Sequence, residues 1–139
     1  MKICTACFLL LSCLSLVAVA QKADDLRTKY GPPNGRGYYT VRPEVAMVVT
    51  FDRSGTIAEA LIAPSDAETS SATMAVAVAK AIVDEVAPPA IRGRYQKTAE
   101  AAVGCTRFSF LEYERVVIQT VTRCDRQGGG VYYERLSWK

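Results

Sequence analysis

Residues Val45–Pro64 read VAMVVTFDRSGTIAEALIAP, and this stretch decides the fold that the sequence predicts. Every second residue from Val45 to Phe51 is large and apolar, which is the alternation of a strand with one buried face. The residues between them, such as Val48, are also mostly apolar. We therefore expect a central strand, or one that is covered on both faces.

The second half of the stretch predicts a hairpin. Asp52–Gly55 has the composition of a turn, because Asp52 can accept hydrogen bonds from the backbone ahead of it and Gly55 can adopt a positive φ. Thr56–Ala63 then returns as the second strand, and Pro64 ends it. We expect the segments that follow to pack on this hairpin.

One clear helix follows the hairpin. Polar residues precede it, with Ser70 or Ser71 as the expected N-cap. From Met74 to Val86 an apolar residue recurs at every fourth position, which predicts one broad apolar stripe. Pro88-Pro89 ends the helix.

Further strands are expected before and after this unit. Three more stretches are rich in aromatic and β-branched residues: Tyr38–Val41, Glu112–Arg123 and Val131–Trp138. The last two predict a second hairpin, whereas Ala90–Gly104 shows no clear pattern. The predicted fold class is α+β, with an antiparallel sheet of four or five strands and one main helix, at about residues 72–86, packed on one face.

The N-terminal segment has the pattern of a signal peptide, assigned to residues 1–20. Lys2 supplies a positive start, Ile3–Val19 carries no charge, and Ala18-Val19-Ala20 is the small-x-small pattern that signal peptidase reads. Two alternatives stay open, which are a retained membrane anchor and a lipoprotein with lipidation at Cys13. After cleavage, residues 21–37 predict a short helix and a loop, and residues 38–139 a single α+β domain.

The cysteines support an exported protein. If the first 20 residues are removed, the chain keeps Cys105 and Cys124. Two cysteines in an exported protein are most simply one disulfide. The alternative is a pair of unpaired thiols, since the sequence does not fix their separation in space.

Composition excludes several kinds of chemistry. The chain has no histidine, so it offers no Ser-His-Asp or Cys-His pair and no imidazole metal ligand. We expect no metal and no cofactor. The net charge of +3 is too balanced to predict nucleic-acid binding. Glu112, Glu114 and Glu134 could supply paired carboxylates for glycoside cleavage, but they are more simply interpreted as cross-strand charge pairs.

Basic and aromatic side chains suggest a binding surface for a protein or a glycan. The sequence groups them in a short basic run and on the predicted second hairpin. Most such residues are ordinary surface or core side chains, so the surface is a hypothesis. The residues assigned to it are Arg92, Arg94, Lys97, Arg107, Arg115, Tyr132, Tyr133 and Arg135.

Part of the chain resembles the C-terminal domain of TonB-type energy transducers. The resemblance rests on the turn at Asp52–Gly55, on Ile57 and Ile62, on Pro64-Ser65, and on an alanine-rich helix that ends in Pro88-Pro89. It covers about fifty residues of the chain. The proline-rich spacer of that family is missing, and the chain continues through a cysteine-bearing hairpin that the family does not need.

A wider pattern is similar to a family of small exported bacterial proteins. It consists of Lys29–Gly31, Val41–Pro43, Val83–Pro89, Tyr113–Val116 and Trp138-Lys139. This resemblance implies export and a fold of this kind, and it implies no activity.

These observations predict a non-catalytic binding module of the periplasm or cell envelope, whose partner is a protein or an envelope ligand. The alternative is a TonB-like, envelope-tethered transducer piece that keeps residues 3–20 as its anchor. A small hydrolase without histidine is a third hypothesis. We expect contact with a membrane only if the N-terminal segment is uncleaved or lipidated.

Overall fold

A computed structural model of the chain describes residues 21–65, 72–124 and 129–139. The predicted signal peptide, the lipidation at Cys13 and the N-cap at Ser70 or Ser71 therefore lie outside the described residues. Among the helices of these three segments, none is both long and apolar enough to cross a membrane.

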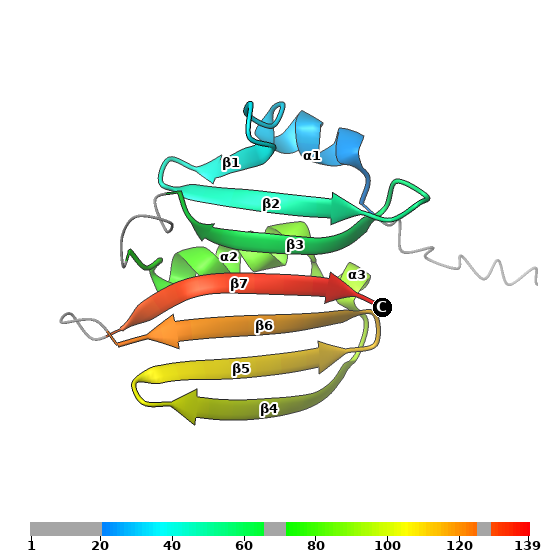
Figure 1. The fold of residues 1–139 in the computed structure, drawn as a ribbon. Coiled ribbons are helices and arrows are strands. Elements are labelled where there is room, and N and C mark those ends of the chain that lie inside the picture. Colours follow the sequence, from blue (N-terminus) through cyan, green and yellow to red (C-terminus); the bar gives the residue numbers. More distant parts are fainter. Residues whose placement is uncertain (1–20, 66–71, 125–128) are drawn as a thin grey trace, which may run out of the picture.

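The described residues form one seven-stranded sheet in the order β1-β2-β3-β7-β6-β5-β4, and all neighbouring strands are antiparallel. The first three strands make one meander and the last four another, and the two meet where β3 pairs with β7 (Figure 1). The strands are β1 (Tyr38–Arg42), β2 (Val45–Phe51), β3 (Ile57–Pro64), β4 (Tyr95–Val103), β5 (Thr106–Tyr113), β6 (Val116–Arg123) and β7 (Gly130–Trp138).

The stretch Val45–Pro64 forms the predicted hairpin, as β2 and β3. Asp52 holds its turn, because its carboxylate accepts hydrogen bonds from the backbone N–H groups of Ser54 (2.8 Å) and Thr56 (3.0 Å). Gly55 has φ of 78°, as the turn requires. The predicted roles of both residues are confirmed.

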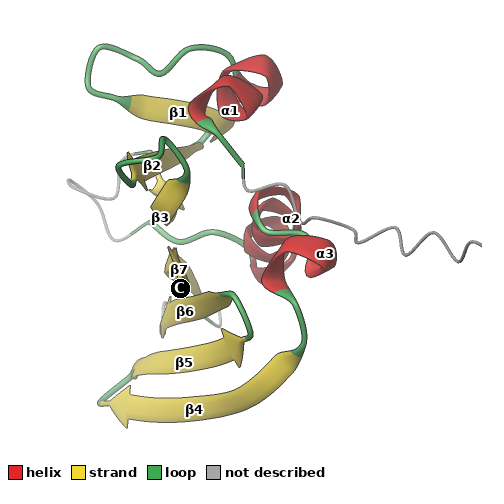
Figure 2. Cartoon of the chain, turned by 90° about the vertical axis from the view of Figure 1, so that its right-hand side faces the viewer, coloured by secondary structure: helices red, strands yellow, loops and turns green. Residues whose placement is uncertain are grey.

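Three short helices lie on one side of the sheet: α1 (Ala23–Tyr30), α2 (Val76–Val86) and α3 (Pro89–Arg92) (Figure 2). The core lies between these helices and the sheet. Its fully buried members include Leu26 of α1, Ile82 of α2, Met47 and Ile62 of the first meander, and Leu136 of β7. None of the helices formed by the described residues lies on the opposite face of the sheet (Figure 2).

The predicted count of four or five strands is wrong, because β4 and β5 were not recognised as separate strands. Every residue of β4 is exposed, and its sequence, YQKTAEAAV, has neither alternation nor many β-branched residues. Its strand conformation is consistent with stabilisation by pairing with β5. The predicted strand Glu112–Arg123 is the end of β5 joined to β6 by a tight turn at Glu114-Arg115.

The predicted main helix at 72–86 is also too long, since α2 begins at Val76. Met74, in the segment before it, is extended and exchanges two backbone hydrogen bonds with Val131 of β7, at 2.7 and 2.9 Å. This bridge competes with helix formation and uses the backbone of Met74 as a short piece of strand. The helices are therefore small, and the fold is mainly an antiparallel sheet.

Glu85 near the end of α2 joins three elements. It accepts a hydrogen bond from the Tyr30 hydroxyl (3.1 Å) and forms ion pairs with Arg42 of β1 and with Lys29 of α1 (3.6 Å). The hydrogen bond from Arg42 lowers the pKa of Glu85. These contacts fix α1 and β1 to the end of α2.

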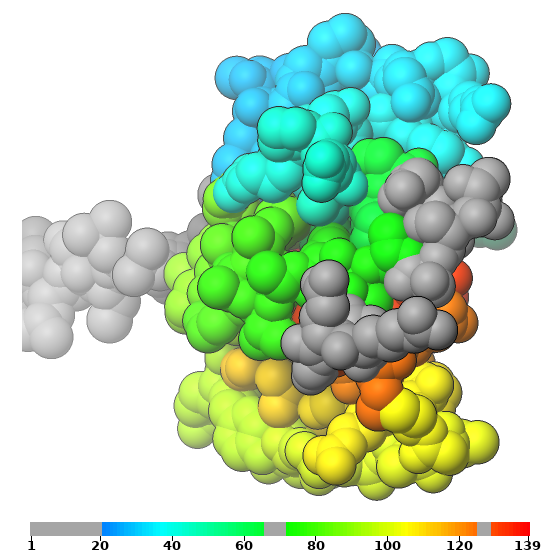
Figure 3. Space-filling model, turned by 90° about the vertical axis from the view of Figure 1, so that its left-hand side faces the viewer, coloured from blue at the N-terminus to red at the C-terminus, as the bar shows by residue number. Residues whose placement is uncertain are grey.

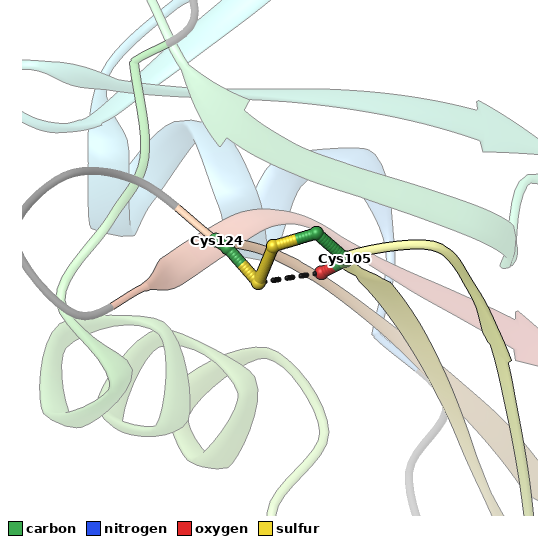
Figure 4. Close-up of a disulfide and its surroundings, with 2 residues drawn as sticks. All are labelled: Cys105 and Cys124. Atoms are coloured by element: carbon green, nitrogen blue, oxygen red, sulfur yellow. Dashed lines mark hydrogen bonds between the residues drawn. A yellow bond between two sulfur atoms is a disulfide. The ribbon is translucent and has the colours of Figure 1, made fainter.

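The predicted disulfide between Cys105 and Cys124 is present (Figure 4). Cys105 lies in the turn between β4 and β5, and Cys124 directly follows β6. The bond therefore joins the β4–β5 turn to the end of β6. Their Cα atoms are 5.5 Å apart, a usual spacing for a disulfide. The bond is compatible with an exported protein.

Candidate functional site

The helix-free face of the sheet carries an apolar groove, which we call the open-face groove. Strand register places Tyr38, Val48, Leu61 and Arg135 in one row across β1, β2, β3 and β7. Val48 is 36% exposed in this row. Of the two alternatives predicted for β2, the central strand is therefore confirmed, since β2 lies between β1 and β3, and cover on both faces is wrong for the described residues.

The groove has a volume of about 250 Å³. Ala46 and Ala63, which face each other across β2 and β3, are small and leave room between larger neighbours. The other lining residues are Arg36, Tyr38, Val48, Leu61, Pro64, Ser65, Tyr132 and Tyr133.

A β-bulge brings two successive tyrosines to this groove. In the pairing of β6 with β7, Val121 is opposite Tyr133 and Thr122 is opposite Val131, so Tyr132 is an extra residue. A bulge breaks the strict alternation of side chains between the two faces. Tyr132 and Tyr133 consequently both line the groove, with their ring centroids 5.8 Å apart.

Arginines flank these rings. The guanidinium of Arg123 is 3.5 Å from the centroid of Tyr132, and that of Arg135 is 5.9 Å from the centroid of Tyr133. Arg135 also lies 3.5 Å from the carboxylate of Glu59, and Arg36 lines the other side of the groove. Stacking on aromatic rings holds a guanidinium in place while it keeps its charge. The groove is therefore apolar at its base and mainly positive at its rim.

The structure divides the eight residues of the predicted binding surface among several places. Tyr132, Tyr133 and Arg135 meet at the open-face groove. Lys97, on the edge strand β4, forms an ion pair with Glu112 at 3.0 Å. Arg107 lies on the face of the sheet that carries the helices, where it lines a cleft with Ser109 and Thr120.

The remaining three arginines stabilise the segment around α3. Arg92 is only 8% exposed and bonds to Asp84 and to the carbonyl of Ala87. Arg115 donates to the carbonyl oxygens of Ala90 (2.7 Å) and Ile91 (2.9 Å). Arg94 forms an ion pair with Glu114 at 2.8 Å. These contacts hold the turn between α2 and β4, so the three arginines do not join the groove.

The three glutamates considered for glycoside cleavage have different environments. The pKa of Glu112 is lowered, mainly by Lys139 and then by Lys97, and that of Glu114 is lowered by hydrogen bonds from Arg94. Burial raises the pKa of Glu134 to about 7. Of the three, only Glu134 thus has the raised pKa of a general acid. Glu112 forms a cross-strand ion pair with Lys97 of β4, whereas Glu114 pairs with Arg94 outside the strands.

Comparisons of the chain with protein-family models, with curated proteins and with solved structures find no match. The two resemblances drawn from the sequence therefore stay predictions.

Sequence reasoning missed the part of the groove that β1, β2 and β3 supply. Tyr38, Val48 and Leu61 lie far from Tyr133 in the sequence and meet it only because β3 pairs with β7. The available signal is the apolar second face of β2, which is equally typical of a central strand and of a strand covered on both faces.

Proposed function

We propose that the protein is an exported, non-catalytic binding module that takes an extended protein segment on the open-face groove. The segment would place an apolar side chain in the groove and an acidic side chain against the arginine rim. The observation that supports this most is the partly exposed apolar row between Tyr38 and Arg135, bordered by ring-stacked arginines.

The size of the groove favours a protein partner over a small molecule. Small-molecule sites usually have about 300–1,000 Å³, whereas this groove has about 250 Å³ and is open to solvent. Such a volume suits one anchoring side chain of a larger partner. Burying that side chain would contribute about 1.5–3 kcal/mol.

Site-specific photocrosslinking in the native envelope tests this proposal. The photoreactive residue p-benzoylphenylalanine replaces Val48 in one variant and Val103 in the control, because Val103 is an exposed valine of β4 away from the groove. We expect one protein to be captured at position 48 and not at position 103. Equal capture at both positions, or none at either, would contradict the proposal.

A second step tests the chemistry. A synthetic peptide that covers the crosslinked segment should contain an apolar and an acidic residue and bind the wild-type protein. Val48→Glu and Arg123→Ala should each weaken its binding about tenfold or more, and Val103→Glu should not. Capture of a lipid or a glycan at position 48 would contradict the proposed protein partner and indicate an envelope ligand in its place.

The TonB-like alternative stays a prediction, since its anchor at residues 3–20 lies outside the described residues. Sequencing the N-terminus of the protein isolated from cells distinguishes the two. A start at Gln21 would exclude the anchored transducer and leave the binding module in place.

A further inference from the structure

A row of polar side chains crosses four strands on the face of the sheet that carries the helices. Glu100 of β4 is opposite Ser109 of β5, Ser109 is opposite Thr120 of β6, and Thr120 is opposite Glu134 of β7. The neighbouring row on this face contains Ile118 and Leu136 and belongs to the core. The polar row is therefore a departure from the apolar pattern that buries this face elsewhere.

The row lies in a cleft of about 420 Å³, which we call the polar cleft. Its lining residues come from β4, β5 and β6, and α2 contributes none of them. Figure 3 shows the side of the molecule that carries the β4–β5 turn, in yellow, and the end of β6, in orange. The lining residues are Glu100, Ala101, Ala102, Arg107, Phe108, Ser109, Thr120 and Thr122.

The cleft has charges of both signs that do not neutralise each other. Glu100 and Arg107 both line it, and within the described part of the chain neither side chain has an ion-pair partner. Arg107 is opposite Ala102, which makes Glu100 its diagonal neighbour. Diagonal neighbours on one face of a sheet have Cα atoms roughly 7 Å apart. Ser109 adjoins both residues, because it is opposite Glu100 and two positions from Arg107 on β5.

We propose that the polar cleft binds a small zwitterion, an amino acid or a dipeptide, with its ammonium group against Glu100 and its carboxylate against Arg107. An extended dipeptide spans roughly 7 Å, which matches the diagonal separation. The hydroxyl groups of Ser109 beside the two charges, and of Thr120 and Thr122 on the neighbouring strand β6, supply hydrogen-bonding groups for the other polar atoms of the ligand. This site is on the opposite face from the open-face groove and does not depend on the function proposed for it.

Glu134 lies behind the same wall and carries a negative charge there when it is ionised. The Thr120 hydroxyl, which lines the cleft, donates a 2.7 Å hydrogen bond to the Glu134 carboxylate. Glu134 is 5% exposed, and no basic side chain forms an ion pair with it among the described residues. Above its raised pKa of about 7, Glu134 is ionised and would attract an ammonium group in the cleft as Glu100 does.

Amide chemical-shift titration tests the proposal, with alanine and glycylglycine as the zwitterions. We expect at least one of them to cause saturable shifts at Ser109 and Thr120. N-acetyl-glycylglycine lacks the ammonium group and glycylglycine amide lacks the carboxylate, so each should bind at least tenfold more weakly than glycylglycine. Glu100→Gln and Arg107→Gln should also reduce binding at least tenfold, and each spectrum reports whether the variant is folded.

Lys97→Gln is the matched control, because Lys97 lies on the same hairpin but on the other face. It should bind as the wild type does. The proposal is overturned if neither zwitterion gives a saturable shift at about 10 mM, a concentration above a millimolar Kd. Equal binding of the charged and blocked compounds, or shifts confined to the open-face groove, would overturn it too.

Discussion

Replacing Glu134 by glutamine should change how the stability of the protein depends on pH. The carboxyl group of Glu134 is buried on β7 and accepts a hydrogen bond from the Thr120 hydroxyl. Burial raises its pKa from the ordinary 4.5 to about 7, and the Thr120 hydrogen bond offsets this only in part. Glutamine has the same shape and carries no charge at any pH.

The size of the effect follows from this pKa difference. Below pH 4.5 the group is neutral in both the folded and the unfolded state, so it costs nothing. Between pH 4.5 and about 7 the unfolded chain loses the proton first, and the free energy of unfolding falls as the pH rises. Each pKa unit is worth 1.36 kcal/mol, so above pH 7 the total loss is about 3 kcal/mol.

Urea denaturation of the oxidised protein between pH 4 and pH 9 measures this loss. Glu134→Gln should remove the decline, so that at pH 8 the variant is more stable than the wild type by up to about 3 kcal/mol. Glu112→Gln is the control with the opposite sign. Lys139 and Lys97 lower the pKa of Glu112, so its contribution to stability is present above pH 4.5 and is lost as the pH falls. If Glu134→Gln has the same pH profile as the wild type, the reasoning is refuted.

Three further outcomes are expected. Replacing Cys105 and Cys124 together by serine should lower the free energy of unfolding by about 3 kcal/mol, because the bond closes a loop of about twenty residues; a urea titration that shows no loss would contradict this. Glu85→Gln should weaken the attachment of α1 and β1 to α2 and so speed amide hydrogen exchange in α1 and β1, while the free energy of global unfolding falls by at most about 1 kcal/mol. Unchanged exchange in these two elements would contradict this. Ile62→Ala should cost about 2–5 kcal/mol in the same titration, because Ile62 is fully buried, and a loss below that range would place Ile62 outside the core.

Local sequence signals were enough to predict part of the fold. The hairpin Val45–Pro64 carries its own information, since alternation gives its strands and Asp52 with Gly55 gives its turn. The disulfide was predictable because only two cysteines follow the segment assigned to the signal peptide. These features depend on residues close together in the chain, or on a pairing without alternatives.

Other elements depend on contacts between distant residues. The turn at Glu114 contains no glycine, proline or asparagine, and it is held by Arg94, which donates to Glu114 from its backbone (3.0 Å) and its side chain (2.8 Å). The alanine-rich β4 is a strand in the pairing with β5. The open-face groove likewise requires the register of β3 against β7, which puts Leu61 opposite Arg135. No local pattern encodes that register.

The junction between β3 and β7 has a consequence for how the chain folds. Among the described residues, β3 and β7 join the two meanders through four paired positions of the ladder, and Ile62 of β3 is opposite Glu134, roughly 70 residues further along the chain. During synthesis, the edge of β3 that pairs with β7 therefore stays unpaired until β7 is made, which exposes it to aggregation. Because closing so long a loop delays folding, we expect formation of this junction to limit the folding rate. A chaperone that covers the edge of β3 would have to act before β7 is available.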